Sequence, residues 1–296
     1  MRTPEIPTIS LNTQSHVQQA SNIILKVEER FNDRKFRQAK VQSHYCTTVM
    51  KEIGSRAIEI INAVKVAMAT SPYCIVIRDI QTSVGRAYIA GISAALGEVT
   101  EPCNLESSLV IRILQPHHDR KEGTFGVLSE SFHTDGTDWQ NPNDLTCLLC
   151  LQADEFGGGE SKVMTMDSII HSLKQSRHQE FSYDEIRNKE FLWKLDENLG
   201  GGDFSAPFLT SDSIRWLKHN LLSVSMLNPH GETDELIQYI NTIIEGNTDH
   251  LKFSMRAGDL LILNNKKLLH ARTLIENPEQ SCRKLLRTKV LYRGST

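Results

Sequence analysis

The chain is 296 residues long, enough to bury a sizeable core in one large domain or two small ones. With 39% hydrophobic and 23% charged residues, its composition is that of an ordinary soluble globular protein. The net charge of -3 provides no overall field that would attract nucleic acid or an anionic membrane, so only a local basic pocket could bind an anion.

The N-terminal stretch 1–16 lacks the apolar segment that a secretory signal peptide needs. No apolar run approaches the ~18 residues that span a bilayer. We therefore expect a cytoplasmic chain whose six cysteines are reduced.

The first elements in chain order are helical. Helices are predicted over 14–31 and 46–69, followed by a strand over 73–79 and a short helix near 84–96. Within the second helix, apolar side chains recur every three or four positions and mark one buried face: Ile53, Ala57, Ile60, Ile61, Val64 and Met68.

From 107 onward, short strand-like runs separated by Gly, Pro and Asn dominate, with two helices over 167–176 and 232–246. This pattern predicts a β-sandwich or barrel core wrapped by helices. The expected strands cover 108–115, 130–134, 145–152, 161–166, 221–227, 251–256, 259–265 and 284–293.

The run 145–152 contains a C-x-x-C motif formed by Cys147 and Cys150, a spacing that zinc and redox sites use. Side chains three apart on a strand point to opposite faces, and the chain has no second C-x-x-C. We expect these two cysteines to be packing residues.

Three motifs place a histidine two residues before a carboxylate, a spacing that puts both side chains on one face of a strand. Together with a histidine from another strand, such a pair forms the 2-His-1-carboxylate triad, which leaves open positions on Fe(II), whereas structural zinc sites are closed by four ligands. The three motifs are His133-Thr134-Asp135, His117-His118-Asp119 and His178-Gln179-Glu180.

Context separates these motifs. Residues 117–119 begin a hydrophilic run after Pro116, and residues 178–180 lie in a polar stretch after a predicted helix. His133 and Asp135 instead stand where a strand meets a loop, the usual position of active-site residues.

A third ligand is offered by His270, in the return strand of a predicted hairpin over 251–275. Taken alone, it could equally be a core histidine. Downstream, Arg283 and Arg287 are four apart and share a strand face. Burying an arginine pair is costly unless it meets an anion, and the planar guanidinium suits a carboxylate.

These motifs together resemble the Fe(II)/2-oxoglutarate-dependent oxygenases of the taurine dioxygenase and clavaminate synthase-like branch. That family has H-x-D/E, a later histidine, and an arginine beyond it. The matching positions are His133, Asp135, His270 and Arg283, and the stretch AGDLLILNNKKLLHAR before and around the distal histidine is similar too. GGGES supplies Ser161 where the family more often has threonine after a glycine-rich turn.

The resemblance covers roughly 73–293 and implies an α+β fold with a mainly β core, a double-stranded β-helix (jelly roll) flanked by helices. We expect one oxygenase domain over 1–296, in which 1–70 is a helical N-terminal extension packed on the core. That extension matches no motif of the family.

The resemblance also implies the ligands. Fe(II) would be bound by His133, Asp135 and His270, and the cosubstrate 2-oxoglutarate by Arg283 with help from Ser161, with O2 as second cosubstrate. In the family's halogenases, Gly or Ala replaces the carboxylate, so the presence of Asp135 favours hydroxylation or a related oxidation such as desaturation or ring closure.

Three residues are candidates for contact with a small-molecule substrate. Arg287 is the first, although it could instead serve 2-oxoglutarate or a structural salt bridge. Arg272 shares a strand face with His270 but could form an exposed ion pair. Trp139, in the loop 136–144, could line a pocket or be ordinary packing.

The function expected from the resemblance is hydroxylation of an unactivated C–H of a small polar substrate, such as a free or carrier-bound amino acid in specialised metabolism. The alternatives are a catabolic sulfonate or aryloxyalkanoate dioxygenase and a non-catalytic, cupin-like metal-binding protein. A metal-only scaffold would need neither Arg283 nor Ser161. Binding to nucleic acid is not expected, since no basic stretch interleaved with aromatic residues is present.

Overall fold

The computed structural model describes residues 5–11, 22–100, 110–117, 119–120, 128, 130–176, 181–187, 189–225 and 231–293. None of the helices in this part of the chain is long and apolar enough to span a bilayer. The helices are α1 (Asn22–Glu29), α2 (Asp33–Phe36), α3 (Ala39–Ile53), α4 (Arg56–Ala69), α5 (Gly85–Leu96), α6 (Met166–Gln175), α7 (Tyr183–Ile186), α8 (Lys218–Ser225) and α9 (Gly231–Gly246). The strands are β1 (Thr8–Ser10), β2 (Cys74–Arg78), β3 (Gly97–Thr100), β4 (Arg112–Leu114), β5 (Glu130–His133), β6 (Leu145–Gln152), β7 (Ser161–Thr165), β8 (Glu190–Lys194), β9 (Asp203–Pro207), β10 (Leu251–Phe253), β11 (Leu260–Asn264), β12 (Leu268–Arg272) and β13 (Lys284–Tyr292).

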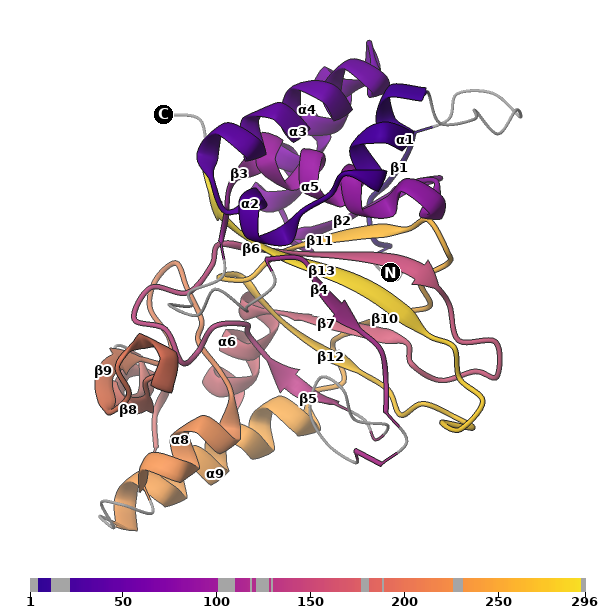
Figure 1. Ribbon diagram of the computed structural model, residues 1–296. Coiled ribbons are helices and arrows are strands. Elements are labelled where there is room, and N and C mark those ends of the chain that lie inside the picture. Colours follow the sequence, from indigo (N-terminus) through magenta and orange to yellow (C-terminus); the bar gives the residue numbers. More distant parts are fainter. Residues whose placement is uncertain are drawn as a thin grey trace.

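Two sheets form the centre of the molecule and face each other (Figure 1). The major sheet has the strand order β1-β2-β11-β6-β13-β3, with β4 also paired to β13, and only its β1–β2 pair is parallel. The minor sheet has the order β10-β7-β12-β5 and is antiparallel throughout. The described chain is therefore a mixed α and β fold built on antiparallel sheets.

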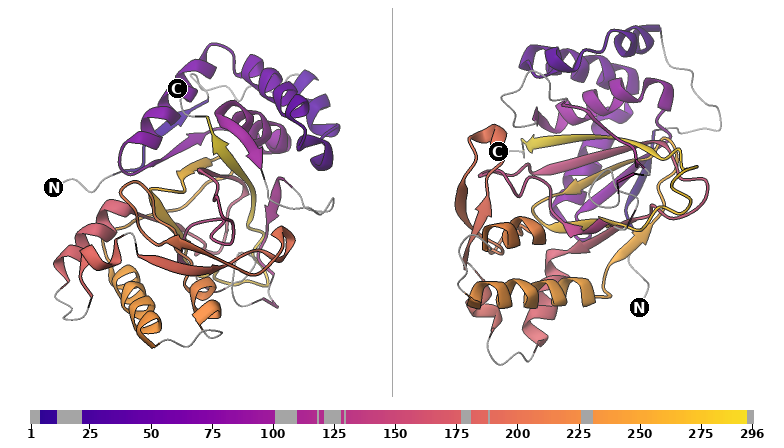
Figure 2. Two further views of the ribbon diagram at one scale, coloured as in Figure 1. Left: turned by 90° about the vertical axis from the view of Figure 1, so that its left-hand side faces the viewer. Right: turned by 60° about the horizontal axis from the view of Figure 1, so that its bottom comes forward.

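Three apolar clusters hold these layers together. One fills the space between the two sheets, a second joins the outer face of the major sheet to α3, α4 and α5, and a third joins the outer face of the minor sheet to α6 and α9. Figure 2 shows the N-terminal helices on one side of the sheets and α6, α8 and α9 on the other. Burial on both faces explains why the central strands β2, β6 and β11 are mostly apolar runs.

In strand β6, alternate side chains face opposite sides of the major sheet. Cys147 belongs to the outer cluster beside the helices, whereas Cys150 belongs to the cluster between the sheets. The prediction that the two thiols point to opposite faces is confirmed, and burial raises the pKa of each to about 11.

Two predicted elements differ from the structure. The run 221–227 was predicted as a strand, but its first residues lie in helix α8. A short apolar run without clear periodicity suits a helix or a strand, and Leu221 is buried in the outer cluster of the minor sheet. The single helix predicted over 46–69 is two helices, since Gly54, with φ +68°, ends α3. The two-stranded sheet β8–β9 was not predicted at all.

Candidate metal centre

His133 and His270 are directly opposed on the neighbouring antiparallel strands β5 and β12, with ring centroids 4.3 Å apart. His270 alternates with Leu269 and Ala271, which face the outer cluster, so its side chain faces the interior between the sheets. Cross-strand pairing therefore brings together two histidines that are far apart in the sequence.

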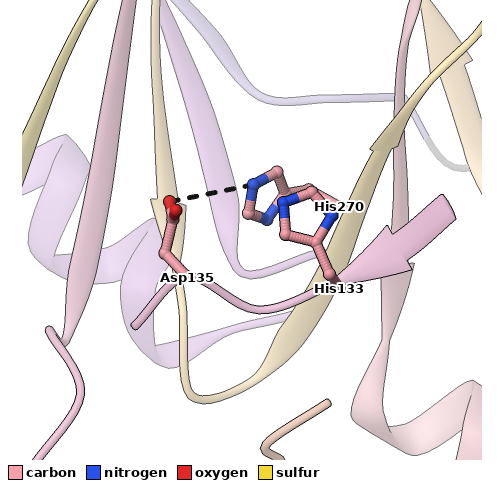
Figure 3. A group of neighbouring side chains, drawn as sticks. All are labelled: His133, Asp135 and His270. Atoms are coloured by element: carbon pink, nitrogen blue, oxygen red, sulfur yellow. Dashed lines mark ion pairs between the residues drawn. The ribbon is translucent and has the colours of Figure 1, made fainter. Parts of the chain in front are cut away.

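Asp135 completes the group from the loop that follows β5. One ligand atom from each of His133, Asp135 and His270 lies within 4.8 Å of the others, and Figure 3 shows the three side chains converging. Nε2 of His270 is 3.8 Å from Oδ2 of Asp135. The three predicted ligands meet at a spacing that a single metal ion could bridge.

The ring nitrogens of the two histidines suit metal binding. Burial, with a further contribution from His133, lowers the pKa of His270 to about 4, so this ring is neutral at neutral pH. Nδ1 of His270 is buried without a hydrogen-bond partner among the described residues, a cost that a bound ligand would offset. Nδ1 of His133 lies 2.9 Å from the carbonyl oxygen of Ser131, and Nε2, the nitrogen left to bind a metal, lies 3.7 Å from Oε1 of Glu130.

The carboxylate of Asp135 is held by three side chains from the major sheet. Arg287 donates from Nη1 to Oδ1 at 2.9 Å, Thr146 donates from Oγ1 to Oδ2 at 2.7 Å, and Nζ of Lys289 is 3.9 Å from Oδ1. Burial by itself opposes ionisation, but Arg287 and Lys289 outweigh it and hold the pKa of Asp135 below its usual range. An ionised carboxylate together with two imidazoles is the donor set of a 2-His-1-carboxylate iron site.

The backbone of Asp135 is fixed by Asn265, in the turn between β11 and β12. The amide of Asn265 accepts a hydrogen bond from the backbone N–H of Asp135 at 2.8 Å and donates to its carbonyl oxygen at 3.0 Å. Asn265, Thr146 and Lys289 were not predicted as site residues. A polar residue within an otherwise apolar strand, such as Thr146 in β6, is the signal that could have indicated such a partner.

Arg283 stands just before β13 and is only 8% exposed. Its guanidinium makes no hydrogen bond or ion pair with another described residue. Burial, followed by the nearby Arg272, lowers the pKa of Arg283 to about 10, so the group is still charged at neutral pH. Asp154 and Glu130 attract this guanidinium without a hydrogen bond, so its burial is costly and a bound anion would compensate for that cost.

Ser161 opens β7 and lies directly opposite Arg272 on β12. Both side chains are buried and share the interior face with Val163 and His270, two residues further along their strands. The glycine-rich turn before Ser161 approaches Arg283 closely: a Cβ on Gly159 would lie 2.9 Å from Cδ of Arg283. The structure thus brings Ser161, Arg272 and Arg283 to one part of the interior.

The candidates for substrate contact have protein partners of their own. Arg287 is paired with Asp135, as described above. Arg272 is buried rather than exposed, and donates to the carbonyl oxygens of Thr273 at 2.9 Å and Leu128 at 3.0 Å. Trp139 is also buried, and the ammonium of Lys289 lies 4.1 Å from the centroid of its ring. Their contact with a substrate stays a prediction.

The rival motifs form no such group. His117 and Asp119 are exposed, and residues 178–180 lie outside the described part of the chain. Within that part, His133, Asp135 and His270 are the one group of His, Cys, Asp or Glu residues whose ligand atoms converge.

Solved structures resemble this fold over nearly their whole length. Asparagine oxygenase in complex with Fe(II), 2S,3S-3-hydroxyasparagine and succinate matches with a TM-score of 0.66 and 16% identity, over 96% of this chain and 93% of that one. The non-haem iron oxygenase OrfP with Fe, succinate and (3S)-hydroxy-L-Arg matches with a TM-score of 0.67 and 12% identity, over 96% and 94%. OrfP with Fe and α-ketoglutaric acid matches with a TM-score of 0.67 and 10% identity, over 97% and 94%. No protein-family model matches the chain, and neither does any curated protein.

Proposed function

We propose that this chain, which has the fold of the non-haem iron oxygenases and carries a converging His-Asp-His group, is an Fe(II)/2-oxoglutarate-dependent dioxygenase. The observation that carries the proposal is the meeting of His133, Asp135 and His270 in an interior that also holds Arg283, a buried arginine whose guanidinium makes no hydrogen bond within the described part of the chain. We further propose that the two facing sheets form the double-stranded β-helix of that family, within a single domain whose residues 1–70 are an N-terminal extension.

In the proposed mechanism, His133, Asp135 and His270 would hold Fe(II) and leave the remaining coordination positions to small molecules. Arg283 would bind the distal carboxylate of 2-oxoglutarate, aided by the hydroxyl of Ser161. When bound, the metal and 2-oxoglutarate would supply the oxidising power, with O2 consumed and succinate and carbon dioxide released. The protein's part is to orient these groups and to exclude water from the space between the sheets.

We propose that the substrate is a small polar molecule such as a free or carrier-bound amino acid, and that the reaction is hydroxylation of an unactivated C–H. The complexes of asparagine oxygenase and OrfP contain hydroxylated asparagine and arginine, which supports this substrate class. Arg287, Arg272 and Trp139 are proposed to contact the substrate. The carboxylate of Asp135, which halogenases of the family lack, supports hydroxylation rather than halogenation.

Two alternatives make different demands on the site. A catabolic dioxygenase would release succinate only with a sulfonate or aryloxyalkanoate. A non-catalytic, cupin-like protein would bind metal but would have no use for Arg283 and Ser161.

The deciding experiment measures succinate release in the presence of Fe(II), 2-oxoglutarate and a panel of amino acids and small acids. We expect at least one compound to stimulate succinate formation, and we expect His270→Ala to abolish it because one of three metal ligands is lost. Arg56→Met, which removes an exposed surface ion pair with Glu59, is the matched control and should retain activity. Full turnover by His270→Ala would contradict the assignment of the ligands.

A further inference from the structure

The loop that carries Asp135 is held by a segment that belongs to neither of the two central sheets. Residues 134–140 follow β5 without strand pairing of their own, and a segment comprising residues 193–220 packs against them. We call residues 193–220 the supporting segment; it includes most of the two-stranded sheet β8–β9 and the start of α8. In Figure 1, β8 and β9 stand beyond the end of the two central sheets.

Arg215 makes the central contact between the supporting segment and the loop. Its guanidinium donates from Nη1 to the carbonyl oxygens of Thr137 at 3.4 Å and Trp139 at 2.9 Å, and from Nη2 to the carbonyl oxygen of Gln140 at 2.9 Å. These acceptors belong to three residues of one short loop, so a single side chain fixes its path immediately after Asp135.

The position of Arg215 is itself fixed by the sheet β8–β9. The central carbon of its guanidinium lies 5.0 Å from the ring centroid of Phe204 and 5.5 Å from that of Trp193. Trp193 is fully buried and donates from Nε1 to the carbonyl oxygen of Ala206 at 2.9 Å. The arginine is therefore a rigid link between β8–β9 and the loop.

Further contacts hold the loop on both sides of Asp135. Before it, Thr134 accepts a hydrogen bond at Oγ1 from the backbone N–H of Trp216 and donates its own N–H to the carbonyl oxygen of Trp216 at 2.8 Å. After it, Nδ2 of Asn220 lies 3.3 Å from Oγ1 of Thr137. The supporting segment thus contacts the loop on either side of the carboxylate residue.

We propose that Arg215 is a positioning residue that holds the loop of Asp135 in register with His133 and His270 and thereby sets the affinity of the site for a divalent metal. This inference rests on the proposed function, because it assumes that the three residues bind a metal. Residues that orient metal ligands without touching the ion typically alter metal affinity by about 10- to 100-fold when they are replaced.

The test measures the binding of Mn(II), which is stable in air, to the metal-free full chain by isothermal titration calorimetry. Arg215→Met keeps an apolar stem but removes every donor, and we expect it to weaken Mn(II) binding about tenfold or more. Arg215→Lys keeps the charge but cannot span three carbonyl groups, and should weaken binding to a smaller extent. Hydrogen exchange within 134–140 should rise in the same order.

Arg56→Met is the control and should bind Mn(II) as the unaltered protein does. A folded Arg215→Met protein with unchanged Mn(II) affinity would overturn the positioning role, even if its melting temperature falls. Should Arg215→Met fail to fold, Arg215→Lys decides: weaker binding supports the role and unchanged binding overturns it. Failure of the unaltered protein to bind Mn(II) would instead reject the proposed function together with this inference.

Discussion

At the scale of single residues, the site contrasts two buried arginines of the same neighbourhood. Nη1 of Arg287 donates a hydrogen bond to Oδ1 of Asp135 at 2.9 Å, whereas the guanidinium of Arg283 has no hydrogen-bond partner among the described residues. A charge-assisted hydrogen bond offsets part of the cost of burying Arg287. Arg283 has no hydrogen bond of this kind among the described residues, which is why we propose that it binds the anionic cosubstrate.

Replacing Arg283 by glutamine should therefore weaken 2-oxoglutarate binding more than metal binding. Loss of a charge-assisted contact worth ~1.5–3 kcal/mol corresponds to a rise in Kd of about tenfold or more. Calorimetric titration of the Mn(II)-loaded protein with 2-oxoglutarate measures this change. Arg256→Gln, at an exposed arginine in the turn before β11, is the control. Equal 2-oxoglutarate affinity in Arg283→Gln and the control would refute the assignment.

At the scale of elements, strand β6 explains why the C-x-x-C motif is not a metal or redox site. The strand is paired on both sides, by β11 and β13, and its two thiols face different apolar clusters. Neither a shared zinc ion nor a disulfide can form across a strand whose side chains alternate.

This arrangement predicts the reactivity of the cysteines. Burial raises the pKa of Cys147 and Cys150 to about 11, so at pH 8 both remain protonated, and the thiolate that attacks iodoacetamide is scarce. Cys282 is exposed and should be alkylated in the folded protein. Peptide mass spectrometry before and after denaturation measures the difference. Rapid modification of Cys147 without denaturant would show that β6 is not packed as described.

At the scale of the whole molecule, the site forms where the two central sheets and the supporting segment meet. His133 and His270 come from the minor sheet, whereas Arg287 and Lys289 reach Asp135 from β13 of the major sheet. Binding of a metal and a cosubstrate in this interior would therefore link the two sheets. A ligand that binds only the folded state increases the free energy of unfolding.

We accordingly expect Mn(II) with 2-oxoglutarate to raise the melting temperature of the full chain. At ligand concentrations about 100 times Kd, the gain in stability is about 2.7 kcal/mol, which corresponds to a shift of several degrees. Differential scanning fluorimetry with and without the ligands measures this shift. His270→Ala provides the comparison, because its melting temperature should respond far less. An equal shift in both proteins would indicate binding elsewhere.

Particular residues show where prediction from the sequence succeeded and failed. The strand over 145–152 was predicted with its observed ends, because both of its faces are buried and the run is apolar except for Thr146 and Gln152. The strand predicted over 221–227 was wrong for residues 221–225, which lie in α8, since a short apolar run has no periodicity that separates helix from strand. Arg215 was missed because its partners are backbone carbonyl groups of residues 137–140, which carry no signal in the sequence.

The sequence by itself determined which residue types were present at which spacing: an H-x-D motif at the end of a strand, a later histidine, and two arginines four apart. Its context also favoured the H-x-D motif of His133 and Asp135 over two other motifs of the same form. Only the tertiary structure brings the ligands together, because His133 and His270 become neighbours through antiparallel pairing of β5 and β12 across more than a hundred intervening residues. The partners of Asp135, namely Thr146, Asn265 and Arg287, come from three separate strands or turns, so their convergence is a property of packing rather than of local sequence.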